Sequence, residues 1–178
     1  MAGQRLTDKT ALEQQTGSGD LYMVVDVSDT TGSAAGTSKK FDSKFLVQTD
    51  KFSLNNTEVL ALDSTSKTLI GALSGYMPMV YSVTVLCTYA LATENQRKDL
   101  IFGFDSSTDV AYWGAVADCM DSVTTDTSYV VQAAQPRNTG SCATSLLNKP
   151  FLCWAEGTGF AGGWSCDIYV TYAYVKVL

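Results

Sequence analysis

The chain has 178 residues, enough for one domain with a long arm, and it carries 12 basic and 18 acidic residues and no histidine. A net charge of −6 argues against nucleic acid as a partner, and the lack of histidine removes the usual triad base and zinc ligand. The 21 Thr, 17 Ser, 14 Gly, 9 Tyr, 7 Phe and 3 Trp indicate a β-rich, turn-rich protein. No apolar run reaches the ~18 residues that span a bilayer, so we expect no membrane insertion.

Aromatic residues divide the chain near residue 75. Residues 1–75 contain only Tyr22, Phe41, Phe45 and Phe52, and all other aromatic residues follow. We therefore predict an N-terminal attachment arm over residues 1–75 and a β-sandwich head domain over residues 76–178.

Within the arm, residues 20–28 form a β-type run and residues 37–41 can pair back on it as a small hairpin. Residues 42–48 are expected to make a helical turn. Two short apolar pieces, 58–62 and 67–71, are interpreted as short strands. Because so few large side chains are present, we expect an extended arm that needs a partner surface to become ordered.

The second part is a succession of strand-like runs separated by turn signals. The predicted strands cover residues 79–90, 99–104, 110–116, 128–133, 151–155 and 165–178. This spacing is typical of a β-sandwich or jelly roll, so the predicted fold class is all-β.

The last strand is apolar on both faces. Ile168, Val170, Tyr172 and Tyr174 share one face by period-2 alternation, and Val175 lies on the other. An exposed strand of this kind promotes aggregation, so we expect it to be central in its sheet, with both faces buried. One face would lie in the core and the other against a neighbouring sheet or subunit, as in a homotrimer.

The five cysteines are irregularly spaced and include no CxxC pair. We expect reduced and mostly buried thiols rather than a disulfide framework or a zinc site. The first six residues lack the apolar stretch of a secretory signal, which favours synthesis in a cytosol. The cysteines are Cys87, Cys119, Cys142, Cys153 and Cys166.

No constellation predicts catalysis, and we expect no catalytic residue, cofactor or metal. The carboxylates in 105–109 and 118–121 admit a glycosidase or Ca²⁺ interpretation, but polar loops are the preferred one. The glycine-rich segment 157–164 lacks the ending of a phosphate-binding loop and is interpreted as a hairpin loop.

Three tryptophans are able to stack on a sugar ring, although packing in the core is the more common fate of aromatic residues in a small sandwich. Trp164 is the strongest candidate because it borders the glycine-rich segment, followed by Trp154 and Trp113.

The first 48 residues have a recognisable layout. Leu-Thr-Asp-Lys-Thr at 6–10 precedes Asp-Leu-Tyr-Met-Val-Val-Asp at 20–26, Gly-Thr-Ser-Lys-Lys-Phe at 36–41 and Phe-Leu at 45–46. This order resembles the N-terminal attachment segment of small appendage proteins of tailed bacteriophages, such as head fibres and tail fibres. Phe41 stands where that pattern usually has Ile or Val, and the loop over 29–36 is long.

The resemblance implies a non-enzymatic structural protein of the virion, a head fibre or capsid decoration protein assembled in the bacterial cytoplasm. The arm would bind other capsid or tail proteins. The alternative is a tail-attached adaptor or receptor-binding protein that recognises host-surface glycans, and a polysaccharide hydrolase is a third, weaker hypothesis. The residues expected to dock on the particle are Leu21, Tyr22, Val24, Lys39, Lys40, Phe41 and Phe45.

Overall fold

The computed structural model describes residues 21–32, 34–104, 112–132, 146–157 and 159–176. The chain divides into two compact units, one ending at Leu46 and one beginning at Val47. Within the described ranges, no helix has the length and apolar character needed to cross a membrane.

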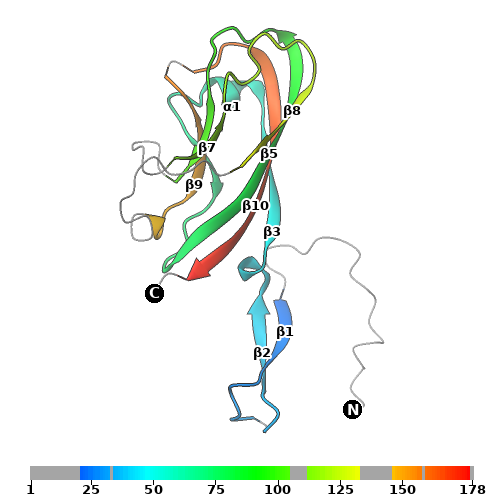
Figure 1. Ribbon diagram of the computed structural model, residues 1–178, viewed down its shortest axis with the longest axis vertical. Helices are drawn as coiled ribbons and strands as arrows, with labels where there is room; N and C mark the ends of the chain where they lie inside the picture. Colours follow the sequence, from blue (N-terminus) through cyan, green and yellow to red (C-terminus); the bar gives the residue numbers. More distant parts are fainter. Residues whose placement is uncertain (1–20, 33, 105–111, 133–145, 158, 177–178) are drawn as a thin grey trace. The chain divides into compact units, whose positions relative to one another are not determined.

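The first unit contains an antiparallel hairpin of β1 (Leu21–Asp26) and β2 (Thr37–Asp42), followed by a short 3-10 helix at Ser43–Phe45 (Figure 1). The Asp42 side chain caps this helix by accepting a hydrogen bond from the Lys44 N–H. The predicted hairpin and helical turn are confirmed.

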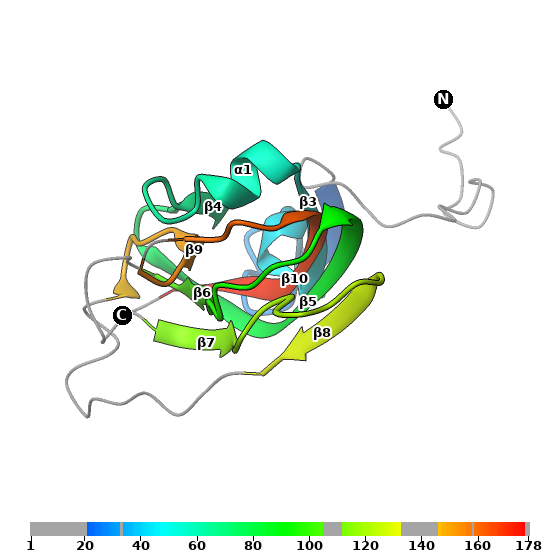
Figure 2. The same ribbon diagram turned by 90° about the horizontal axis from the view of Figure 1, so that it is seen from above.

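The described part of the second unit contains eight strands in two four-stranded antiparallel sheets. One sheet has the order β3-β10-β5-β8 and the other β4-β9-β6-β7. Viewed from above, the two sheets lie on opposite sides of the domain (Figure 2). The strands are β3 (Gln48–Leu54), β4 (Lys67–Ile70), β5 (Tyr76–Ala92), β6 (Leu100–Gly103), β7 (Tyr112–Val116), β8 (Thr127–Val131), β9 (Phe151–Ala155) and β10 (Gly163–Lys176).

The pairing pattern is that of a jelly roll. Strand β3 pairs with β10, β4 with β9, β5 with β8, and β6 with β7. In chain order, the first strand of the domain therefore pairs with the last, the second with the second-last, and so on inward. Further ladders, β10 with β5 and β9 with β6, complete the two sheets. The predicted all-β sandwich is confirmed, with the jelly-roll order of strands.

The core lies between the sheets and contains side chains from both of them. In the sheet with β9, the Phe151 ring makes edge-on contacts with Phe104 and Trp113 and is stacked on Phe102. In the other sheet, Val83, Val85, Ile168 and Val170 are fully buried on the inner face. These complementary inner faces explain why the alternating runs of the sequence fold as a two-layer sandwich.

Strand β10 is central in its sheet, as predicted, but only its inner face is fully buried. Trp164, Cys166, Ile168, Val170 and Tyr172 are each at most 5 % exposed. The outer face is half-buried, and Val175 is 36 % exposed. No second layer of the described chain covers the outer face, so the expected burial against a neighbouring sheet is not found within these residues. Burial of this face against another subunit stays a prediction.

The predicted boundary at residue 75 is also wrong, because residues 47–75 belong to the second unit. Strand β3 hydrogen-bonds to β10 along its whole length, and its last residue, Leu54, is buried in the core. The piece at 58–62 is not a strand, because residues 58–60 belong to helix α1 (Asn56–Leu60). This helix begins with a capping box between Asn55 and Glu58. The piece at 67–71 does form β4.

A matched pair of substitutions tests which face of β10 supports the fold. Val170→Asp places an unpaired charge at a fully buried position, and we expect it to lower the free energy of unfolding by several kcal/mol or to prevent folding. Val175→Asp should leave the chain folded, because this side chain reaches solvent. Urea denaturation followed by tryptophan fluorescence checks both, and equal losses would contradict this assignment of faces.

Candidate functional site

The hairpin has two distinct faces. On one face of the hairpin, Tyr22 lies opposite Phe41 and Val24 opposite Lys39. On the other face, Met23 lies opposite Lys40 and Val25 opposite Ser38. Exposure is greatest on the second face, where Met23 is 78 % and Val25 is 58 % exposed. No apolar side chain in the described part of this unit is fully buried. A lone two-stranded hairpin is marginally stable in water, so this surface is suited to docking on a partner.

Of the residues expected to dock, Tyr22 and Val24 are partly exposed, while Phe41 and Phe45 contact each other edge-on. Lys40 is exposed beside Met23, and nothing is described of the Leu21 side chain. Sequence reasoning missed Met23 and Val25, although their alternation with Tyr22 and Val24 in a short β-run was visible.

Lys39 has an internal role. Its Nζ lies 2.8 Å from an Asp26 carboxylate oxygen and 2.9 Å from one of Asp29. Hydrogen bonds from Lys39 and Ser28 lower the pKa of Asp26, and bonds from Thr31 and Lys39 lower that of Asp29 to about 2. The Lys39 ammonium therefore stabilises the hairpin loop through these two ion pairs, and it is less available for the predicted docking contact.

The glycine-rich segment is not a hairpin loop, because it connects β9 in one sheet to β10 in the other. It holds an anion, and the anion is a side chain of the protein itself. The Glu94 carboxylate is 1 % exposed and accepts hydrogen bonds from the backbone N–H groups of Ala161 (2.8 Å) and Gly162 (2.7 Å) through one oxygen. Its other oxygen accepts from the N–H groups of Asn95 and Gln96.

Burial raises the pKa of Glu94, but the hydrogen bonds from Gly162, Ala161 and Gln96 outweigh it and the net pKa is lowered. The nearby Trp164 indole also lowers this pKa, although its buried N–H makes no hydrogen bond that meets geometric criteria. Gly162 is required at its position, since a Cβ there would lie 2.9 Å from the Glu94 backbone. The carboxylate thus joins the segment to residues 94–96 and is not available to a ligand.

The three tryptophans have different environments. Trp164 is 1 % exposed and packs edge-on against Phe160, with ring centroids 4.9 Å apart, so it packs in the core and is not placed to contact a sugar. Trp113 is 8 % exposed and packs against Phe151 in the core. Trp154 is half-buried on the outer face of its sheet, beside Ile101 of β6.

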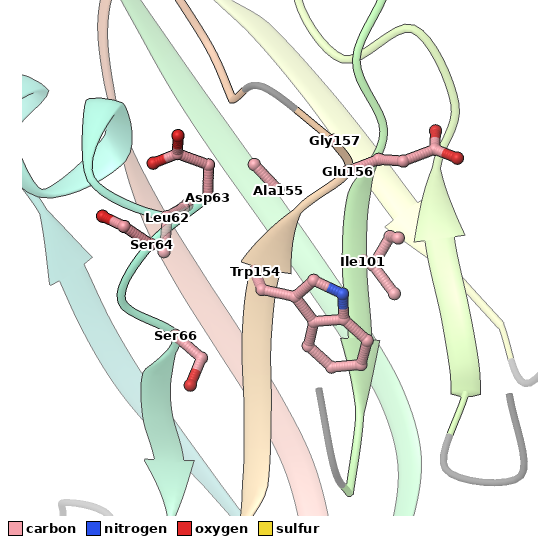
Figure 3. Close-up of a pocket in the computed structure, with 9 residues that line it drawn as sticks. All are labelled: Leu62, Asp63, Ser64, Ser66, Ile101, Trp154, Ala155, Glu156 and Gly157. Carbon is pink, nitrogen blue, oxygen red and sulfur yellow. The ribbon is translucent and has the colours of Figure 1, made fainter. Parts of the chain in front are cut away.

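Trp154 lines a pocket of about 350 Å³ (Figure 3). The indole ring lies between Ile101 on one side and the hydroxyl-bearing turn that follows α1 on the other. The lining residues are Leu62, Asp63, Ser64, Ser66, Ile101, Trp154, Ala155, Glu156 and Gly157. Sequence reasoning missed this pocket, because its walls come from three segments that are far apart in the chain, around residues 62–66, 101 and 154–157.

The pocket walls are fixed by bonds that cross between these segments. The Ala155 N–H donates to the Leu62 carbonyl at 3.1 Å, and the Glu156 N–H donates to the Asp99 carbonyl at 3.1 Å. The base of the turn is closed by the Lys67 ammonium, which lies 2.6 Å from a Glu58 carboxylate oxygen. The site is therefore formed before any ligand arrives.

The thiols are reduced and buried at the four described positions. Burial raises the pKa of Cys153 to about 12 and also raises that of Cys166, so neither is a reactive thiolate at neutral pH. Cys142 lies outside the described residues, as do the carboxylates at 105–109. Asp121 forms a 3.8 Å ion pair with Arg97, and the described residues include no group of side chains that could hold a metal ion.

Comparison with known proteins gave no match among family models, curated proteins or solved structures.

Substitution of Glu94 tests the role of the buried carboxylate. Each of its oxygens faces two N–H donors, so in Glu94→Gln the amide NH₂ must oppose two of them in either orientation. We expect this change to lower the free energy of unfolding by about 3 kcal/mol at pH 7. Glu156→Gln, at an exposed position, is the control and should have little effect.

The same pair of proteins has a defined pH dependence. The folded-state pKa of Glu94 lies below 4.5, so its stabilising effect is complete above that pH and is lost as the pH falls through the folded-state value. The stability difference between wild type and Glu94→Gln should therefore shrink as the pH falls below 4.5 and through the lowered folded-state pKa. Urea denaturation at several pH values measures it, and a constant difference would contradict the assignment.

Proposed function

We propose that this chain is a structural protein of a bacteriophage particle, a head fibre or capsid decoration protein. It binds the particle through its N-terminal hairpin and displays the jelly-roll domain. The observation that carries this proposal is the apolar hairpin face around Met23 and Val25, which the described part of its own unit leaves in solvent. Such a face is stable when another protein covers it.

Two further observations support the proposal. The jelly roll has its own core, so it needs no contribution from the hairpin to bury apolar surface. Jelly rolls are also a recurrent architecture of capsid proteins, an argument by analogy of fold. Lys40, exposed beside Met23, adds a positive charge at the docking face, which suits a partner surface that is apolar with an acidic border.

Purified virions that carry the gene for this chain test the proposal. We expect the protein in such particles by mass spectrometry, with extra cryo-electron microscopy density on the capsomers. Density at the tail would instead favour the tail-attached adaptor or receptor-binding protein. Absence of the chain from purified particles would refute both.

The docking face can be tested by substitution in the same system. Met23→Asp combined with Val25→Asp should reduce the copies of the protein per virion at least tenfold, because two charges would be buried against the partner. The control is Leu60→Asp, an apolar and 39 % exposed position on α1, outside both the hairpin and the β3-β10-β5-β8 sheet, which should leave incorporation unchanged. Equal incorporation of all variants would exclude this face as the docking surface.

We also propose that the protein assembles as a homotrimer in which neighbouring copies cover the half-buried outer face of the β3-β10-β5-β8 sheet. Met79, Tyr81, Leu86 and Val130 of β5 and β8 are exposed, and closed symmetry hides such a surface without unlimited growth. Multi-angle light scattering should give a mass three times that of the 19.1 kDa chain. A stable monomer at micromolar concentration would contradict the trimer.

A further inference from the structure

The pocket around Trp154 has the chemistry of a carbohydrate site. Its floor is apolar and consists of the indole ring and the Ile101 side chain, neighbours in adjacent strands β9 and β6. A sugar ring presents a C–H face that packs on such a surface, with its hydroxyl groups directed outward. An aromatic floor with a few fixed polar groups is the general design of small-ligand sites.

The rim supplies the polar groups. Asp63, Ser64 and Ser66 stand on the turn after α1, and Glu156 stands at the end of β9 (Figure 3). The carboxylates of Asp63 and Glu156 and the Ser66 hydroxyl make no hydrogen bond or ion pair with other described residues. A carboxylate accepts hydrogen bonds from two adjacent hydroxyl groups, so these side chains are ready to bind a sugar edge.

The position of Asp63 is restricted by the backbone of Gly159, which lies beside it. Gly159 has a φ of +80°, and a Cβ at that residue would lie 2.8 Å from the Cβ of Asp63. Asp63 therefore packs directly against a backbone that has no side chain, which limits where its carboxylate can go. An acceptor held in this way loses little freedom on binding.

The charge of the rim selects the kind of sugar. The lining residues include two carboxylates, those of Asp63 and Glu156, and no Lys or Arg. The Lys98 ammonium lies near Gly157 and offsets only one of the two negative charges, so the rim stays negative. Sugars that carry carboxylate or phosphate groups are repelled by this rim, whereas neutral sugars are not. Quaternary ammonium groups are typically bound in cages of several aromatic rings, and this pocket has a single ring.

We propose that this pocket binds one ring of a neutral sugar stacked on Trp154. The volume of about 350 Å³ is near the lower end for ligand pockets, which fits a single ring and not a long chain. The site is independent of the docking hairpin, so binding is measurable on the isolated chain whether or not the protein is part of a virion.

The test uses the purified full-length protein and ligand-observed NMR. The neutral probes are the methyl glycosides of glucose, galactose, mannose and rhamnose, together with N-acetylglucosamine. N-acetylneuraminic acid is the anionic comparison and choline the cationic one. We expect saturation transfer to at least one neutral sugar with a Kd of about 1 mM, as suits a shallow single-ring site, and weaker transfer to the other two classes.

Substitutions separate this pocket from adventitious binding. Trp154→Ala should weaken the neutral sugar at least tenfold, and Asp63→Asn should weaken it by a smaller factor. The controls are Tyr22→Ala, an exposed aromatic on the hairpin, and Asp118→Asn, an exposed carboxylate outside the pocket, both of which should bind like wild type. Thermal melts confirm that each variant is folded.

Three outcomes would overturn the proposal. They are no transfer to any neutral sugar, binding that survives Trp154→Ala in the folded variant, and stronger binding of N-acetylneuraminic acid or choline than of every neutral sugar.

Discussion

The pairing of β10 with β5 is the constraint on which the rest of the domain depends. These are the two longest strands, of 14 and 17 residues, and they are hydrogen-bonded along the whole of β10. Their register places Ile168 beside Val85 and Val170 beside Val83, all on the inner face. A slip of one residue would turn these side chains toward solvent and Asp167 toward the core, so burial fixes the register. Strands β3 and β8 then complete this sheet on its two open edges.

The sequence predicted the elements whose signal is spread over many residues. The long alternating runs that became β5 and β10 leave little choice but strands, because apolar side chains at every second position match only a pleated sheet. Short local signals are weaker predictors. Asn55 and Glu58 form a capping box that is visible in the sequence, but the apolar run at 58–62 that follows it also fits a short strand, and the strand prediction is wrong. The boundary prediction failed because it followed aromatic content, whereas residues 47–75 contribute aliphatic side chains to the core. These are Leu54, Val59, Leu62, Leu69 and Ile70.

The sites depend on contacts that no local pattern records. Alternation in β9 places Phe151, Cys153 and Ala155 inward and Trp154 outward, but Leu152 is also outward and apolar, so the strand did not reveal its exposed face. Trp164 was the strongest sugar-contact candidate because it borders the glycine-rich segment, but Gly162 of that segment binds the Glu94 carboxylate. The partners of Glu94 at Ala161 and Gly162 lie 67 and 68 positions away in the chain, and only the closed fold brings them together.

The antiparallel pairing of the first and last strands of the jelly roll has a mechanical consequence. Gln48 at the start of β3 lies opposite Tyr172 near the end of β10, so the chain enters and leaves the domain at the same end of one ladder. Tension applied between these two points opens the ladder like a zipper, one hydrogen-bonded pair after another, and does not shear all pairs together. Resistance to pulling in this direction is therefore set by the first few pairs, Gln48 with Tyr172 and Thr49 with Thr171, whose hydroxyl groups are 2.9 Å apart.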